Sequence, residues 1–113
     1  MQAYSAKLLR LHFTERDRYQ GQPLHEAVIE KCRELKVAGA TVFRGLTGYG
    51  DTAEIHRSHV LKHDLPIVVQ IVDSAENIQG LIPVLEDMLD KGLMAVSDVS
   101  VIRIQKSKSA QNV

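Results

Sequence analysis

The order in which strand-like and helix-like apolar patterns alternate along the 113 residues limits the possible folds more than any other feature. Strands are predicted where apolar or β-branched residues crowd together, and helices where apolar residues recur every three or four positions. The predicted strands cover residues 3–13, 40–44, 65–73 and 95–104. One predicted helix lies between the first two strands and another between the last two. We therefore expect an α+β fold, the ferredoxin-like βαββαβ two-layer sandwich, with two helices on one face of a four-stranded antiparallel sheet.

Proline, glycine and serine mark the expected ends of the two helices. Pro23 follows a polar loop at 14–22 and suits the first helical position, where its missing N–H has no partner to lose. Gly39 is expected to supply the left-handed residue that ends the first helix. Ser74 is expected to be the N-cap of the second helix, and Gly92 to end it.

Length and charge predict one domain with no general affinity for polyanions. Residues 1–105 suffice for a single core, and the polar residues 106–113 form a predicted C-terminal tail. The 14 basic residues equal the 14 acidic ones, which does not favour binding to nucleic acid or to an anionic membrane. The sequence has neither a leader-like N-terminus nor an apolar run of about 20 residues. We therefore expect no membrane insertion, and we expect a cytoplasmic protein.

The third strand is apolar on both of its faces. Between Leu65 and Val72 only Gln70 interrupts the apolar residues, although two helices can cover just one face of the sheet. A second layer is needed for the other face, and the chain has no further element to provide it. We therefore expect homo-oligomerisation through the sheet.

The connection between the second and third strands is far longer than a hairpin needs. It spans residues 45–64, whereas antiparallel strands are usually joined by about 2–5 residues. Its glycines could direct backbone N–H groups at an anion, or could simply shape a mobile loop. The candidate ligand-binding residues in and beside it are Arg44, Gly45, Gly48, Tyr49, Gly50 and Arg57.

The same connection contains three histidines, and a basic residue stands near the end of the last strand. His56, His59 and His63 would face one way on a helical turn and could bind a divalent metal, although histidine is also a common polar loop residue. Ser58 lies beside two of these histidines, but adjacency in a loop defines no catalytic geometry, so we do not expect an enzyme.

Arg103, expected within the last strand, is a candidate phosphate ligand.

Several of these segments together resemble the PII-like family of small uncharacterised bacterial and archaeal proteins. The resemblance is carried by residues 39–45, 48–50, 55–56 and 64–66, with further matches at Gly21, Pro23, Leu24 and residues 71–73. It implies a ferredoxin-like homotrimer related to PII signalling proteins and to CutA-type trimers. The long connection would then correspond to the PII T-loop.

The resemblance also implies a function. PII proteins bind adenine nucleotides in clefts between subunits. Gly45, Gly48 and Gly50 resemble the base of the T-loop, and Arg103 resembles a phosphate ligand on the last strand, whereas residues 90–94 lack the glycine-rich turn of PII proteins. We therefore predict a regulatory small-ligand sensor, with an adenine nucleotide as the candidate ligand, whose long loop docks on a partner such as a membrane transporter. The alternative is a CutA-like divalent metal-binding protein.

Overall fold

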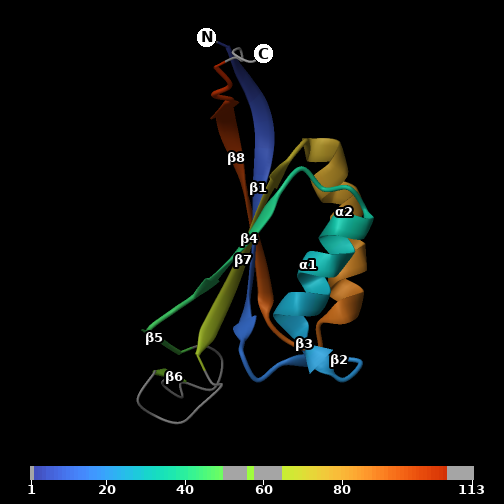
Figure 1. Ribbon diagram of the computed structural model, residues 1–113, viewed down its shortest axis with the longest axis vertical. Coiled ribbons are helices and arrows are strands. Elements are labelled where there is room, and N and C mark those ends of the chain that lie inside the picture. Colours follow the sequence, from blue (N-terminus) through green and yellow to red (C-terminus); the bar gives the residue numbers. More distant parts are fainter. Residues whose placement is uncertain (1, 50–55, 58–64, 107–113) are drawn as a thin grey trace.

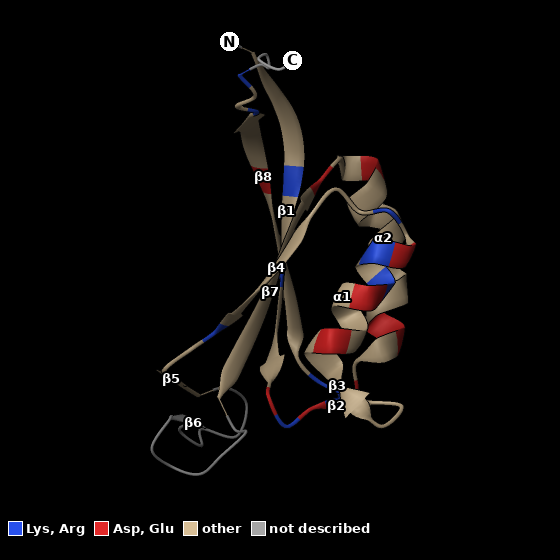
Figure 2. Cartoon of the chain, viewed as in Figure 1, with Lys and Arg blue, Asp and Glu red and all other residues tan. Residues whose placement is uncertain are grey.

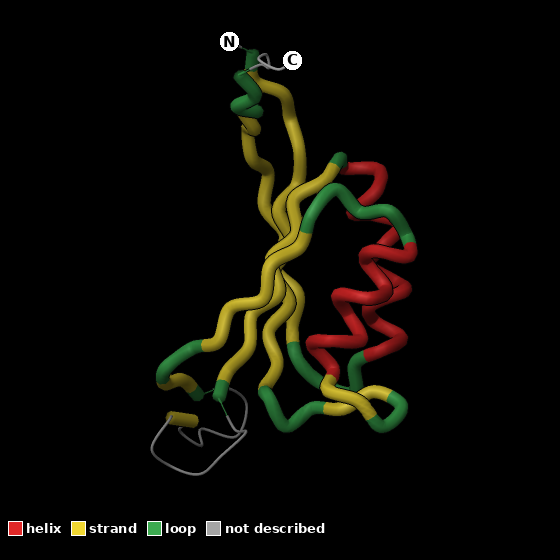
Figure 3. Tube along the Cα trace, viewed as in Figure 1, coloured by secondary structure: helices red, strands yellow, loops and turns green. Residues whose placement is uncertain are grey.

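The computed structural model describes residues 2–49, 56–57 and 65–106, with the side chains of residues 56 and 57 excepted. A four-stranded antiparallel sheet has the strand order β4-β7-β1-β8. Both helices lie against the same face of this sheet (Figure 1, Figure 3). The sheet strands are β1 (Ala3–Thr14), β4 (Ala40–Arg44), β7 (Pro66–Asp73) and β8 (Leu93–Ile102), and the helices are α1 (Leu24–Glu34) and α2 (Ala75–Met88). This architecture confirms the predicted ferredoxin-like α+β sandwich.

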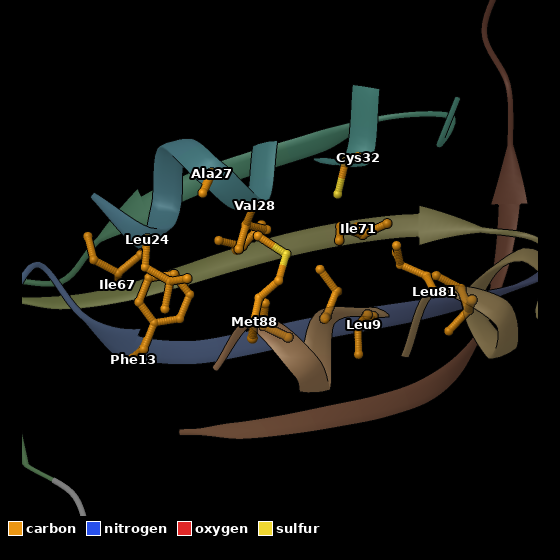
Figure 4. Packing of buried hydrophobic residues seen from close by; sticks show 14 residues of the cluster. Leu9, Phe13, Leu24, Ala27, Val28, Cys32, Ile67, Ile71, Leu81 and Met88 are labelled. Carbon is orange, nitrogen blue, oxygen red and sulfur yellow. The ribbon is translucent and has the colours of Figure 1, made fainter. Parts of the chain in front are cut away.

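The core lies between the helices and the two central strands, β1 and β7. Alternate residues of each strand point to the helical layer, because side chains of a strand alternate between its faces. The strand residues of this core are Leu9, Leu11 and Phe13 of β1 and Ile67, Val69 and Ile71 of β7. The buried helix residues are Leu24, Ala27, Val28 and Cys32 of α1 and Ile78, Leu81, Leu85 and Met88 of α2. Figure 4 shows these side chains packed in one layer, where each large aliphatic group stabilises the fold by about 1.5–3 kcal/mol.

The polar segment before α1 contains more order than the sequence indicated. Strands β2 (Arg18–Tyr19) and β3 (Gln22–Pro23) pair across a two-residue turn. Gln20 and Gly21 have φ angles of 49° and 84°, and two successive positive φ angles are typical of a type I′ hairpin. Pro23 closes this hairpin with an extended ψ of 133°, so α1 begins at Leu24 and the prediction for Pro23 was wrong by one residue.

Helix α1 ends at Glu34, and the left-handed residue that follows it is Lys36, not the glycine that the sequence indicated. Lys36 has a φ of 61°, and its N–H donates to Arg33 O while the N–H of Val37 donates to Cys32 O. These two bonds form a Schellman motif, in which the following apolar residue folds back onto the helix. Val37 packs against the core in this way, and Gly39 has no positive φ. The burial of Val37 therefore set the position of the left-handed residue.

The start of α2 agrees with the prediction and includes one further capping residue. Ser74 Oγ accepts a hydrogen bond from the backbone N–H of Asn77 at 3.1 Å. The carboxylate of Asp73 accepts bonds from the N–H of Ala38 (2.9 Å), the N–H of Ser74 (2.7 Å) and Asn77 Nδ2 (3.0 Å). Burial acts to raise the pKa of Asp73, but these hydrogen bonds together hold it below 3.8. Asp73 thereby connects β7, α2 and the segment that leads into β4.

We expect Asp73→Asn to lower the unfolding free energy by about 1 kcal/mol at pH 7, because a charged acceptor of three hydrogen bonds is lost. The pKa of Asp73 is lower in the folded state, so its contribution is complete above the unfolded-state pKa, near 4, and disappears as the pH falls through the folded-state pKa. Urea denaturation across this range should show the two proteins converging at acid pH. Glu34→Gln, which removes an exposed ion pair of α1, is the control. A difference in unfolding free energy between wild type and Asp73→Asn that does not change with pH would contradict the role assigned to the Asp73 carboxylate.

The end of α2 and the limits of β8 differ from the prediction by a few residues. Helix α2 ends at Met88, and Gly92 lies in the connection that follows, with a φ of 133°. A Cβ at Gly92 would stand 2.6 Å from the carbonyl oxygen of His12, so a close backbone approach requires glycine there. Strand β8 begins at Leu93 and ends at Ile102, so it starts and stops two residues earlier than expected.

The sheet face opposite the helices carries apolar side chains on both sides of a polar row formed by Arg10, Gln70 and Thr41, and it lacks a second layer within the described residues. Residues directly opposite each other in antiparallel strands share a face. Val68 pairs with both His12 and Phe43, and Val72 pairs with Leu8, which places these side chains together on the open face. Phe43 and Leu93 are exposed there. Among the described residues, no helix has the length and apolar character needed to span a membrane.

Candidate functional site at the root of the long loop

The long loop leaves the sheet at Arg44 and returns to it at Pro66, and its two ends are held together by hydrogen bonds. The N–H of Gly45 donates to Pro66 O at 2.8 Å. Beyond it, β5 (Thr47–Gly48) pairs with β6 (His56–Arg57), so that Thr47 stands opposite Arg57. These short strands extend past the end of the sheet on the side away from the helices (Figure 1). We call residues 44–48 together with Leu65 and Pro66 the loop root.

Two glycines of the loop root make room for the ring of Pro66. A Cβ at Gly45 would lie 2.8 Å from Pro66 Cγ, and one at Gly48 would lie 3.3 Å from it. Neither glycine has a positive φ, so close packing and not an unusual backbone conformation accounts for their presence. The N–H of Gly45 already donates to Pro66 O and is not available to a ligand. Gly45 therefore contributes to the site by leaving room for the ring of Pro66.

Arg44 forms an ion pair with a residue that sequence reasoning missed. Its Nε lies 2.7 Å from Oε2 of Glu15, whose side chain is only 10% exposed, whereas that of Arg44 is 63% exposed. The N–H of Glu15 also donates to Leu65 O at 2.9 Å. Glu15 belongs to the short connection after β1, where acidic and basic residues alternate (Figure 2). Nothing in that local pattern could single it out, because its partners lie 29 and 50 residues further along the chain.

The remaining candidates in the loop are placed to different extents. Tyr49 is 74% exposed, and Leu46, which was not among the predicted candidates, is 78% exposed. The backbone of Arg57 lies in β6, opposite Thr47. Gly50 lies outside the described residues.

Arg103 is far from the loop root of its own chain. It follows the last residue of β8, so the expectation that it lies within the strand was wrong. Its Nη2 donates to the hydroxyl oxygen of Tyr4 at 3.4 Å, near the start of β1. The loop root is at the opposite end of β1, where Phe13 pairs with Ile67, and the roughly ten intervening steps along the strand span about 33 Å. Arg103 and Arg44 of one chain therefore cannot contact the same small ligand.

Only part of the predicted histidine site falls within the described structure. The backbone of His56 lies in β6, opposite Gly48, while His59 and His63 lie outside the described residues. Among the residues whose side chains are described, no three histidine, cysteine or acidic groups are gathered so that they could hold a metal ion. The histidine site stays a prediction.

Comparison with known proteins places the chain in a family. The profile of DUF190, described as "Uncharacterized ACR", matches residues 6–101. The chain belongs to this family. A UPF0166 protein from Aquifex aeolicus is 39% identical over 106 residues, which cover 90% of this chain and 98% of the relative. The UPF0166 protein MJ1524 from Methanocaldococcus jannaschii is 29% identical over 103 residues, which cover 87% and 93%.

Solved structures at low sequence identity share the fold. CPII from Thiomonas intermedia K12, a nitrogen regulatory PII-like protein bound to ADP, AMP and bicarbonate, has a TM-score of 0.63 at 20% identity over 90% of this chain and 92% of CPII. A putative PII-like signaling protein from Thermus thermophilus has a TM-score of 0.68 at 18% identity, over 90% and 94%. The divalent ion tolerance protein CutA1 from Ehrlichia chaffeensis has a TM-score of 0.58 at 14% identity, over 88% and 84%. The resemblance to PII-like proteins and CutA that the sequence indicated is thus confirmed at the level of the fold.

We expect Gly45→Ala to destabilise the protein by about 1–3 kcal/mol, because the new methyl group would collide with the ring of Pro66. Gly39→Ala is the matched control, since a Cβ there meets nothing within 4 Å and the backbone needs no positive φ. Urea denaturation should separate the two variants. Equal stabilities would show that the loop root does not need the space that glycine leaves.

Proposed function

We propose that the protein is a PII-like regulator: a homotrimeric sensor of a small anionic ligand, with an adenine nucleotide as the leading candidate, and not an enzyme. The observation that carries this proposal is the separation of Arg103 from the loop root. Both groups suit an anion, yet one chain holds them at opposite ends of its sheet. A site that uses both must combine two copies of the chain.

The open sheet face supports assembly. It presents half-buried and exposed apolar side chains, including Val68, Val72 and Phe43, that two helices on the other face cannot cover. Burial of such a face between copies is favourable because it removes apolar area from water. We propose that the copies form a closed ring in which Arg103 of one chain lies near the loop root of its neighbour. The ADP and AMP bound to CPII make adenine nucleotides the first ligands to test.

The exposed residues in and beside the loop root support a second role for the loop. Leu46 and Tyr49 lie beyond the end of the sheet and are 78% and 74% exposed. Aromatic side chains such as that of Tyr49 are enriched at protein interfaces, and Leu46 adds exposed apolar area to the same loop. We propose that ligand binding orders the loop and that the loop then docks on a partner protein, with a membrane transporter at the cytoplasmic surface as the candidate.

We expect light scattering of the purified protein to give a trimer and calorimetry to detect ADP binding. Arg44→Ala and Arg103→Ala should each abolish or strongly weaken that binding, since each removes a phosphate partner. When the two variants are dissociated, mixed and reassembled, about one quarter of the sites should recover, because a site needs an intact loop root from one copy and an intact Arg103 from another.

Three results would contradict this proposal. A monomer that binds ADP with full affinity would remove the need for a second copy. No recovery on mixing, with both variants folded and trimeric, would show that the two arginines do not share a site. Binding of a divalent cation without any nucleotide binding, lost when His56, His59 and His63 are all replaced by alanine, would instead favour the CutA-like alternative.

A further inference from the structure

Glu15 contacts both ends of the long loop. Its carboxylate pairs with Arg44, where the loop departs, and its backbone N–H donates to Leu65 O, where the loop returns. Glu15 itself directly follows β1, a central strand of the sheet. One residue thus connects the rigid core to both ends of a segment that the sequence singled out as functional.

The burial of Glu15 makes its pairing with Arg44 difficult to break. The carboxylate is largely removed from water, and among the described residues Arg44 is its only ion-pair partner. If Arg44 moved away, the mostly buried Glu15 carboxylate would lose this partner, which is unfavourable even though the Arg44 side chain itself is 63% exposed. An anion that arrives at the loop root is therefore not expected to draw Arg44 away from Glu15.

The ion pair leaves the rest of the guanidinium group available. The ion pair with Glu15 is made at Nε, no hydrogen bond joins the two terminal nitrogens of Arg44 to a described residue, and the Arg44 side chain is 63% exposed. Those nitrogens form the edge with which arginine makes two parallel hydrogen bonds to a phosphate or carboxylate. Fixing Nε limits the rotation of a long side chain and so lowers the entropy lost when an anion binds.

We propose that Glu15 is a positioning residue for anion binding: it holds Arg44 by Nε so that the terminal nitrogens are presented to the ligand at the loop root. This inference rests on the proposed function, because it concerns the same anion site. It predicts that removing the Glu15 carboxylate weakens anion binding, whereas simple charge repulsion predicts that the same change strengthens it. A carboxylate that only competed for Arg44 would weaken anion binding, and its removal would strengthen it.

The test measures ADP affinity for wild type, Glu15→Ala, Arg44→Ala and the double variant by nuclear magnetic resonance titration, which reaches weak complexes. Glu15→Ala should weaken binding about tenfold in the wild-type background, the loss expected when one charge-assisted hydrogen bond is no longer pre-organised. It should have no effect in the Arg44→Ala background, because Glu15 acts through Arg44. Glu34→Gln, which removes an exposed ion pair on α1, should bind ADP like wild type.

Each outcome is decisive. Unchanged or tighter binding by Glu15→Ala overturns the inference, as does equal weakening in both backgrounds, which would indicate a purely structural role. If Glu15→Ala fails to melt cooperatively, Glu15→Gln replaces it, with weaker binding again expected because the amide is a poorer acceptor for arginine. If wild type does not bind ADP, the proposed function falls and the inference falls with it, whereas failure of the Glu15 variants alone leaves the proposed function standing.

Discussion

The antiparallel pairing of β1 with β7 is the constraint on which the other features depend. Its register places Leu9 opposite Ile71, Leu11 opposite Val69 and Phe13 opposite Ile67. All six side chains point to the helices and are buried. Because side chains alternate along a strand, a shift of one residue would turn every one of them to the open face. The hydrophobic core therefore fixes the register, and the register places the end of β1 beside the start of β7.

That placement creates the loop root. With Phe13 opposite Ile67, the next residues of the two strands bring Glu15 to Leu65, and the pairing of β4 with β7 brings Arg44 opposite Ile67. Three segments remote in sequence thereby meet at one end of the sheet, where Gly45 and Gly48 lie against Pro66. The same register carries the start of β1 and the end of β8 to the other end of the sheet, together with Tyr4 and Arg103. The division of the candidate anion ligands between two ends is thus a direct consequence of core packing.

Local patterns allowed the elements to be predicted well and their ends less well. The stripe from Ile78 to Met88 has helical period, and the apolar run in β7 is short and β-branched, so both elements could be recognised without the structure. Ser74 acts on its own helix and was also predictable. The left-handed residue at the end of α1 was not, because the burial of Val37 favours Lys36 at that position although glycine is intrinsically better there.

The amino-acid sequence alone determined the ferredoxin-like order of elements, the doubly apolar β7 strand, the unusual length of the 45–64 connection and the candidates Arg44, Gly45 and Gly48. These properties depend on periodicity, residue type and spacing, which are local. Only the tertiary structure decided that Glu15 pairs with Arg44, that Pro66 is the reason for the two glycines and that Arg103 lies at the far end of the sheet. Those facts depend on strand register, which is set by burial of the whole core and joins residues that are distant along the chain.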